Sequence, residues 1–142
     1  MAFWDEATRF HVDAMAAPFV TAPQTLVVVV ASNLFGDILT DLGAAIQGGL
    51  GFAASANIDR TRANPSMFEP VHGSAPDIAD LGIANPVAAI WSGAMMLDHL
   101  GEAAAAAAVM RAIEATTARG VGVAHGRHKT DDIATAVLAA LD

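Results

Sequence analysis

The segment 27–41 constrains the fold of this chain more than any other. Its first part, Val27–Ala31, is a short run of apolar and mostly β-branched residues, which is typical of a strand covered on both faces. A polar Ser-Asn pair ends the run, and Gly36 permits a tight backbone path into the next element. From Asp37 onwards the apolar residues recur with helical spacing. The segment therefore predicts a buried strand, a sharp turn and a helix.

Two acidic residues open this predicted helix. Asp37 and Asp41 are four positions apart, so both carboxylates lie on one helical face, one turn from each other. Like charges at this spacing repel, by about a few tenths of a kcal/mol, and a bound divalent cation would reverse the sign of that interaction. Hard oxygen ligands suit Mg²⁺ or Mn²⁺. Acids in a first helical turn also complement the helix dipole, and spacing alone leaves both explanations open.

Composition excludes several classes of protein. The 142 residues are 54% hydrophobic, which is enough for one domain with a substantial core. Cysteine is absent, which rules out disulfides and thiolate chemistry, and the net charge of -8 argues against nucleic acid and anionic membranes as partners. No apolar run is long enough to span a bilayer, and the first residues lack the features of a signal peptide, so we expect a cytoplasmic protein.

The rest of the chain predicts an α/β fold in which helices predominate, with no internal domain boundary in residues 1–142. In chain order the pattern predicts a short helical piece at 3–10, a helix that starts near Asp13 and ends near Pro18, a weak strand at 52–58 and an extended segment at 66–71. Helices at 87–100 and 102–119 follow, then an irregular or extended return at 120–128 and a final helix capped by Thr130. His125, Arg127 and His128 in the return are expected to form a solvated polar turn.

A second candidate site lies in the loop that follows His72. Gly73, Ser74 and Ala75 have little side-chain bulk, so a ligand can approach their backbone closely. A short helix is expected to follow, and its free N–H groups could bind an anion. Asp77 could accept hydrogen bonds from the two hydroxyls of a ribose and repel a 2′-phosphate, which would select NAD. Residue chemistry alone favours a simpler explanation, a capped turn in which Asp77 stabilises its helix.

Three motifs, taken together, resemble the signatures of the β-decarboxylating dehydrogenases. They are Ser32–Asp41 (SNLFGDILTD), Phe68–Ile78 (FEPVHGSAPDI) and Gly82–Pro86 (GIANP), and they occur in the order and at the spacing of that family. The family includes isocitrate, isopropylmalate, homoisocitrate and tartrate/D-malate dehydrogenases. The sequence that flanks the motifs, such as Ile90–Asp98, is most similar to that of the tartrate/D-malate branch. The resemblance extends over residues 10 to 142.

The resemblance implies the fold of the isocitrate/isopropylmalate dehydrogenases, and only its C-terminal portion. The expected structure is an incomplete α/β domain with several core helices around a partial sheet. Residues 1–9 depart from the family: Trp4-Asp5-Glu6 resembles a family helix, but the segment between it and His11 is far shorter than in the family. The N-terminal part of the family sequence is missing. Truncation should leave apolar sheet and helix surface exposed, so we expect the isolated chain to oligomerise or to be poorly soluble.

The resemblance also implies a metal site and a cofactor site. Asp37 and Asp41 would bind Mg²⁺ or Mn²⁺, and Asp13 would match a third carboxylate that reaches in from the partner subunit, which implies a homodimer. The residues matching the family's NAD-binding loop are Glu69, His72, Gly73, Ser74, Ala75, Asp77, on the adenosine ribose, and Asn85, near the adenine.

The implied activity is NAD-dependent and metal-dependent oxidation of a 2-hydroxy acid such as tartrate or D-malate, with possible decarboxylation. The Lys and Tyr that act as acid and base in the family lie in the missing part; this chain has no Tyr, and its single lysine is Lys129. No catalytic residue is therefore assigned to the chain, which is expected to be inactive alone. Two alternatives remain: a non-catalytic NAD-binding or dimerisation module, and one half of a split enzyme.

Overall fold

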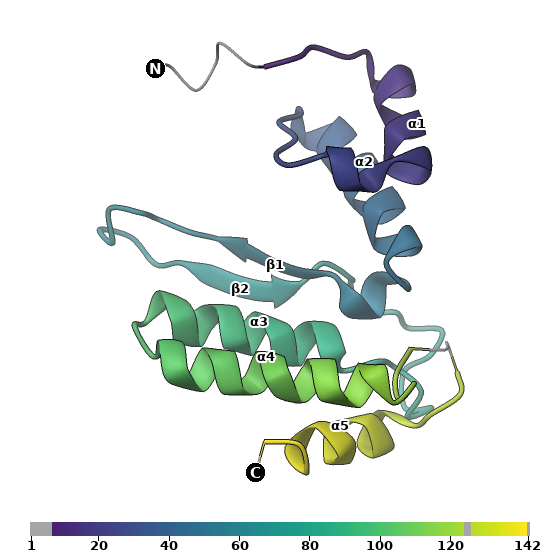
Figure 1. Ribbon diagram of the computed structural model, residues 1–142, viewed down its shortest axis with the longest axis vertical. Coiled ribbons are helices and arrows are strands. Elements are labelled where there is room, and N and C mark those ends of the chain that lie inside the picture. The colour runs from purple at the N-terminus through teal and green to yellow at the C-terminus, as the bar shows by residue number, and fades with distance from the viewer. Residues whose placement is uncertain (1–6, 124–125, 142) are drawn as a thin grey trace. The chain divides into compact units, whose positions relative to one another are not determined.

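The computed structural model describes residues 7–123 and 126–141. The chain forms two compact units, Met1–Gln47 and Gly48–Asp142, which we describe separately (Figure 1). The expectation that residues 1–142 form a single portion of one larger domain stays a prediction.

The first unit consists of two helices and the segment that joins them. Helix α1 spans Val12–Thr21, a 3₁₀ turn (η2) spans Pro23–Thr25, and helix α2 spans Asn33–Ile46. The two helices pack against each other, and Met15, Leu39 and Ala44 are buried between them and their neighbours. So small a core leaves most apolar side chains of this unit facing solvent.

The buried strand predicted at Val27–Ala31 is not formed. These residues have no regular structure, and the side chains of Val27, Val28 and Val30 are 93%, 70% and 80% exposed. A strand needs a neighbour for its N–H and C=O groups, and within the described residues the only sheet is a hairpin in the second unit. The apolar, β-branched composition is typical of a strand, but the described residues offer it no neighbouring strand to pair with.

Both helices of the first unit differ from their predicted limits. Helix α2 begins at Asn33 rather than at Asp37, so both acids lie beyond its first turn. The helix-dipole explanation for them therefore loses its basis, since that interaction fades beyond the first turn. Helix α1 continues to Thr21, three residues past Pro18. Residues 7–10 are not helical, and the other positions of the predicted N-terminal helical piece, 3–6, lie outside the described residues.

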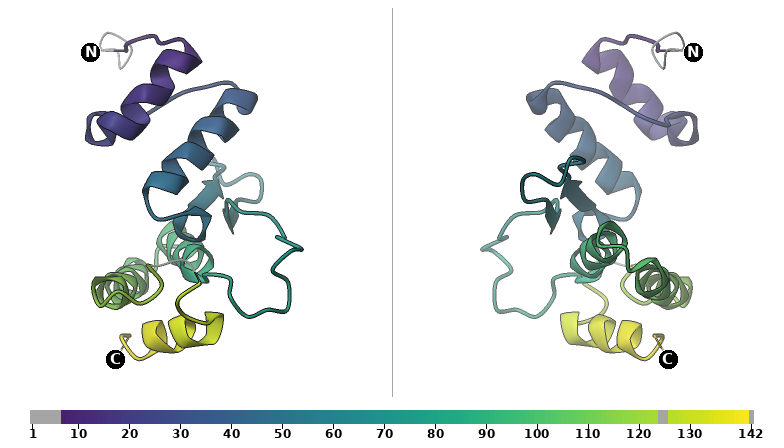
Figure 2. Two further views of the ribbon diagram at one scale, coloured as in Figure 1. Left: turned by 90° about the vertical axis from the view of Figure 1, so that its right-hand side faces the viewer. Right: turned by 90° about the vertical axis from the view of Figure 1, so that its left-hand side faces the viewer.

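The second unit holds a β-hairpin and three helices (Figures 1 and 2). A 3₁₀ turn (η3, Leu50–Phe52) leads into β1 (Ala54–Asn57), which pairs antiparallel with β2 (Met67–Pro70) so that Ser55 lies opposite Glu69. Helices α3 (Val87–His99), α4 (Ala103–Ala118) and α5 (Thr130–Leu138) follow. Each of these elements falls within or close to its predicted range. The hairpin packs against α3, and α4 lies between α3 and α5.

The core of the second unit forms where the three helices meet. Val87, Ala112, Ile113, Ile133 and Val137 are buried together, with Trp91, Val109 and Met110 among the side chains packed around them. Thr116 is also fully buried and donates its hydroxyl to the carbonyl of Ala136, so that α4 and α5 share a hydrogen bond as well as apolar contacts. Small residues on α4 let the helices approach closely, because alanine adds little volume at the interface.

The helix predicted after Pro76 is absent. Residues 76–82 form consecutive turns, with hydrogen bonds from Ile78 N to Ala75 O and from Leu81 N to Ile78 O. Ala75 and Asp80 have φ angles of 42° and 61°, which lie in the left-handed region and interrupt a right-handed helix on both sides. The segment between them is too short to nucleate a helix. Figure 2 shows this loop extending away from the hairpin before it returns to α3.

Candidate functional site

A cleft of about 720 Å³ lies within the second unit, a size typical of small-molecule sites. Three stretches of the chain form its walls: Gly48–Gly51, residues of the 72–85 loop, and residues of the 122–133 segment. The cleft is thus built from parts of the sequence up to 85 positions apart, brought together by the packing of α3 and α5 on α4.

Five of the seven predicted cofactor residues line this cleft. They are His72, Gly73, Ser74, Ala75 and Asn85. A Cβ added to Gly73 would meet no atom within 4 Å, so the loop is open at that point. Glu69 and Asp77 are both exposed and are not among the lining residues: Glu69 lies on β2, and Asp77 lies in the turns that follow Pro76.

The loop of the cleft is held by the start of α5. The hydroxyl of Thr130 donates to the carbonyl of Ala84 at 2.6 Å, and its backbone N–H donates to the carbonyl of Gly82 at 2.9 Å. The Lys129 ammonium donates to the carbonyl of Leu81 at 3.3 Å. Thr130 was predicted to cap α5, but it is the first helical residue and its side chain bonds the loop instead. The Asp132 carboxylate accepts a bond from the backbone N–H of Lys129.

The side chain of Asn85 connects the walls of the cleft. Its Nδ2 donates to the carbonyl of Gly122 at 2.9 Å, and its Oδ1 accepts from the N–H of Val87 at 3.1 Å. These two partners fix the orientation of the amide, because the reverse orientation would oppose two donors and two acceptors. A Cβ on Gly51 would lie 2.6 Å from the Cβ of Asn85, which shows how closely the two backbones approach.

The ionisable side chains that line the cleft are two aspartates and two histidines. Asp80 and Asp131 line it, and its described lining contains neither Lys nor Arg. The remaining titratable lining residues are His72 and His128. This balance favours a neutral or hydrogen-bonding group over an anionic one wherever these carboxylates are near.

The C-terminal wall of the cleft was missed by the sequence prediction. Its lining residues include Gly122, Val123, Gly126, His128, Thr130, Asp131 and Ile133. Within this return Gly122 is buried, and of the residues expected to form a solvated polar turn Arg127 is exposed and His128 is half-exposed. The available signal was the pair of glycines Gly120 and Gly122, whose φ angles of 79° and 77° mark a tight return towards the core. His125 lies outside the described residues.

The predicted metal residues all belong to the first unit, and all three are exposed. Asp37 and Asp41 lie one turn apart on α2, and Asn33 donates to the Asp37 carboxylate at 3.3 Å. Asp13 lies in the first turn of α1. Among the residues that the structure describes, no three His, Cys, Asp or Glu side chains converge as a metal site within one chain. Two hard oxygen donors on one helical face fit part of a Mg²⁺ or Mn²⁺ site and leave the remainder to other groups.

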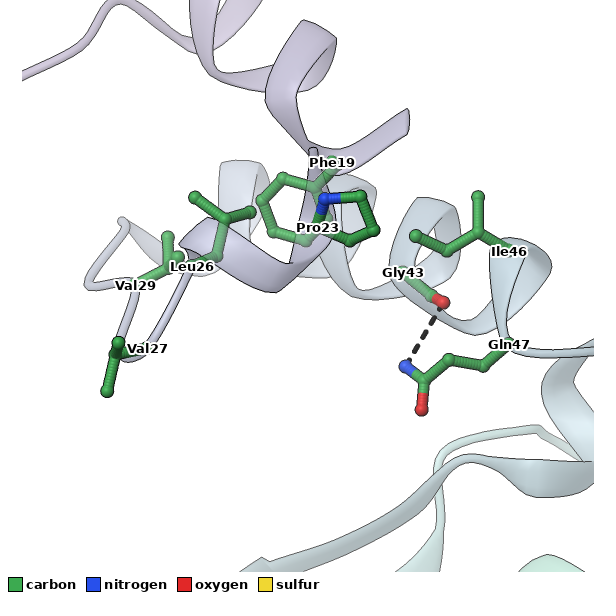
Figure 3. Close-up of a pocket in the computed structure, with 8 residues that line it drawn as sticks. All are labelled: Phe19, Pro23, Leu26, Val27, Val29, Gly43, Ile46 and Gln47. Atoms are coloured by element: carbon green, nitrogen blue, oxygen red, sulfur yellow. Dashed lines mark hydrogen bonds between the residues drawn. The ribbon is translucent and has the colours of Figure 1, made fainter. Parts of the chain in front are cut away.

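A second hollow, of about 430 Å³, lies between α1 and α2 (Figure 3). Phe19, Pro23, Leu26 and Ile46 line it, together with Val27 and Val29 from the extended run. Its polar feature is a bond within α2 and its cap, from Gln47 Nε2 to the carbonyl of Gly43 at 3.2 Å. With no ionisable side chain in its described lining, the hollow offers no catalytic or metal-binding chemistry.

Comparison with known proteins assigns the chain to a family. The family model of isocitrate/isopropylmalate dehydrogenase matches residues 6–140. The 3-isopropylmalate dehydrogenase of Mycobacterium tuberculosis is 59% identical over 137 residues, which are 96% of this chain and 40% of that protein. The probable tartrate dehydrogenase/decarboxylase of Bacillus subtilis is 50% identical over 134 residues, covering 85% of this chain and 38% of that protein.

Solved structures agree with the sequence comparison. The crystal structure of isocitrate dehydrogenase from Methylococcus capsulatus matches with a TM-score of 0.84 and 47% identity, covering 92% of this chain and 39% of that one. The chain thus spans about 40% of the length of the relatives it matches. None of the helices among the described residues has the length and apolarity to cross a membrane. The predicted fold class, an incomplete isopropylmalate-dehydrogenase-like α/β fold, is confirmed, and the chain belongs to the isocitrate/isopropylmalate dehydrogenase family.

Proposed function

We propose that this chain carries the nucleotide-binding part of an NAD-dependent, divalent-metal-dependent dehydrogenase that oxidises a 2-hydroxy acid. The observation that carries the proposal is the cleft of about 720 Å³ whose walls include His72, Gly73, Ser74, Ala75 and Asn85. These are residues that the family resemblance associates with NAD, and they lie together although Asn85 is separated from the others by ten positions or more.

The loop would receive the adenosine half of the cofactor. The small side chains of Gly73 and Ser74 leave backbone accessible, and a ribose hydroxyl pair could donate to an exposed carboxylate such as that of Asp77. Because Asp77 is not among the lining residues, the ribose would have to lie at the edge of the cleft. Glu69, exposed on β2, would contribute only at that edge.

The charge of the cleft favours NAD over NADP. Asp80 and Asp131 line it, and Asp77 is close in sequence, so a 2′-phosphate would meet carboxylates. The same argument applies to the diphosphate, which finds no cationic side chain in the described lining. Backbone N–H groups would have to satisfy the phosphate oxygens, as they do in other nucleotide sites.

The metal would be held by two subunits. Asp37 and Asp41 present carboxylates one turn apart, and we propose that Asp13 of a second copy supplies the third, so that the functional assembly is a homodimer. A Mg²⁺ or Mn²⁺ ion held by these carboxylates would supply polarisation of the oxygen atoms of a bound hydroxy acid, and NAD⁺ would supply the hydride acceptor. The acid and base are not assigned to this chain, because it has no Tyr and one lysine, Lys129, whose amine bonds the carbonyl of Leu81.

The substrate proposed is a 2-hydroxy dicarboxylic acid. Relatives are named for 3-isopropylmalate and for tartrate, and both compounds belong to this class. The flanking motifs predict tartrate or D-malate, whereas identity is higher to the isopropylmalate enzyme, at 59% against 50%. We therefore place 3-isopropylmalate first. A non-catalytic NAD-binding or dimerisation module and half of a split enzyme are the alternatives, motivated by the 40% coverage of the relative. A cytoplasmic location stays a prediction.

Titration of the ¹⁵N-labelled chain with NAD⁺, followed by amide NMR, tests the proposal. We expect saturable shifts at Gly73, Ser74 and Ala75 and none at the tip of the β1–β2 hairpin. Addition of Mn²⁺ should broaden the resonances of α2 near Asp37 and Asp41, and Asp37→Asn together with Asp41→Asn should abolish that broadening. A folded chain whose loop resonances do not move at millimolar NAD⁺ would contradict the proposal.

A further inference from the structure

Asn85 joins three separate stretches of the chain that form the cleft. Its Nδ2 holds the carbonyl of Gly122, 37 positions away, and its Oδ1 holds the N–H of Val87 at the start of α3. The Cβ of Asn85 occupies the space that a side chain at position 51 would need: a Cβ built on Gly51 would lie 2.6 Å from it. The walls Gly48–Gly51, the 72–85 loop and the 122–133 segment therefore meet at this one residue.

The backbone around Gly122 depends on such an anchor. Gly122 is buried, its φ angle is 77°, and an added Cβ would lie 3.3 Å from Ile133. Its N–H donates to Nδ1 of His128 across a long 3.5 Å contact, so the stronger fixed bond at this residue is the one that its carbonyl accepts from Asn85. Without the bond from Asn85, Gly122 could still adopt its left-handed conformation, but no strong hydrogen bond would fix its position.

We propose that Asn85 is a positioning residue, which acts on nucleotide affinity by holding Gly51, Gly122 and α3 in the geometry of the cleft before any ligand binds. The inference rests on the proposed function for its ligand, but the arrangement that it describes exists in the free chain. Pre-organisation of this kind raises affinity because the cost of ordering the walls does not fall on binding. A residue that only touched the adenine would leave the free chain unchanged when replaced.

Two uncharged replacements of Asn85 distinguish the contributions of its two hydrogen bonds. Asn85→Ala removes both, whereas Asn85→Ser keeps an oxygen that can accept from the Val87 N–H, as serine does near helix starts, but is too short to reach Gly122. Asn57→Ser is the matched control, because Asn57 is exposed at the end of β1 and its side chain makes no hydrogen bond to another described residue.

Amide NMR and hydrogen exchange of the full-length variants, recorded without nucleotide, decide the inference. We expect Asn85→Ala to speed exchange at Val87 and to shift the Gly51 and Gly122 resonances. Asn85→Ser should restore protection at Val87 but leave Gly51 and Gly122 displaced, and Asn57→Ser should change none of the three. If Gly51 and Gly122 in both Asn85 variants match the wild type, the inference is overturned.

A calorimetric titration with NAD⁺ provides the functional measurement. Loss of one neutral hydrogen bond is worth about 1 kcal/mol, so Asn85→Ser should weaken NAD⁺ binding about fivefold. Unchanged affinity in a variant whose Gly122 has moved would contradict the positioning role. If the wild-type chain binds no NAD⁺, the proposed function fails, and the exchange data still decide whether Asn85 holds the walls together.

Discussion

The hydroxyl of Thr130 donates to the carbonyl of Ala84 at 2.6 Å, across 46 positions of sequence. The bond ties the first turn of α5 to the loop that precedes α3, and the backbone N–H of Thr130 adds a second bond to Gly82. The loop that contains the predicted NAD residues is therefore supported from the C-terminal helix, which a prediction confined to the loop motif does not anticipate.

Removing this hydroxyl should destabilise the second unit and loosen the loop. We expect Thr130→Val to lower the free energy of unfolding by about 1 kcal/mol, because the shape is kept and one hydrogen bond is lost. Thr135→Val, on an exposed face of the same helix, serves as the control. Urea unfolding of the two variants measures the difference, and equal stability of both would show that the bond to Ala84 contributes nothing.

Asp59 should make stability depend on pH at the acidic end. The hydroxyl and N–H of Thr61 and the amide groups of Asn64 donate to its carboxylate and hold the pKa of Asp59 well below its ordinary value. A depressed pKa in the folded state means that the stabilisation is complete above the ordinary value of about 3.9 and is lost as the pH falls below it.

The comparison of wild type with Asp59→Asn measures this dependence. The gap in unfolding free energy between the two should be widest at neutral pH and should shrink as the pH is lowered through 4 to 2. A gap that stays constant over this range would mean that the carboxylate charge of Asp59 is not what the loop stabilises.

The exposed valine run should drive self-association of the chain. Val27 and Val30 are 93% and 80% exposed, and contiguous apolar surface with unpaired backbone favours pairing with another chain. Replacing both by lysine should shift the chain towards monomer in analytical ultracentrifugation while leaving its helix content unchanged. Leu138→Lys, at an exposed position on α5 away from the valine run, is the control and should have little effect. A wild-type chain that sediments as a monomer at all concentrations would refute this expectation.

Because the lining of the cleft is acidic, phosphate groups on a nucleotide should add little to its binding affinity. With Asp80 and Asp131 in the cleft and no Lys or Arg in its described lining, adenosine should bind about as tightly as ADP. Competition titrations at low and high salt measure this, and Asp131→Asn should improve ADP binding more than adenosine binding. A large gain in affinity from adenosine to ADP, lost at high salt, would point to cations that the described cleft does not contain.

The sequence predicted local elements well where their stabilisation is local. Helices α3 and α4 carry apolar residues at helical spacing and end close to Gly101 and Gly120, and both they and the hairpin form close to the predicted positions. The strand predicted at Val27–Ala31 was wrong because a strand is not stabilised locally: it needs neighbouring strands, which lie elsewhere in the sequence. The helix predicted after Pro76 was wrong because Ala75 and Asp80 adopt left-handed conformations, and the sequence gives little sign of these conformations when the residue is not glycine.

The candidate site was predicted in part for the same physical reason. The small side chains of the 72–75 loop indicate that a ligand can approach the backbone, so this wall of the cleft was predicted from the sequence. The wall at 122–133 carries no ligand-binding motif in the sequence, and its residues become lining only when α5 packs against α4. Asn85 was placed near the adenine by resemblance, and its bonds to Gly122 and Val87 became visible only in three dimensions.

Calorimetric titration of the purified chain with NAD⁺, with and without Mn²⁺ and beside an Asp77→Ala control, decides whether the cleft binds the cofactor. We expect saturable binding by the wild-type chain and weaker binding by the control, because Asp77→Ala removes the carboxylate that would accept hydrogen bonds from the ribose hydroxyls. A folded chain that releases no heat and shows no saturation at millimolar NAD⁺ would contradict this expectation, and the family motifs would then persist without the activity they carry in its relatives.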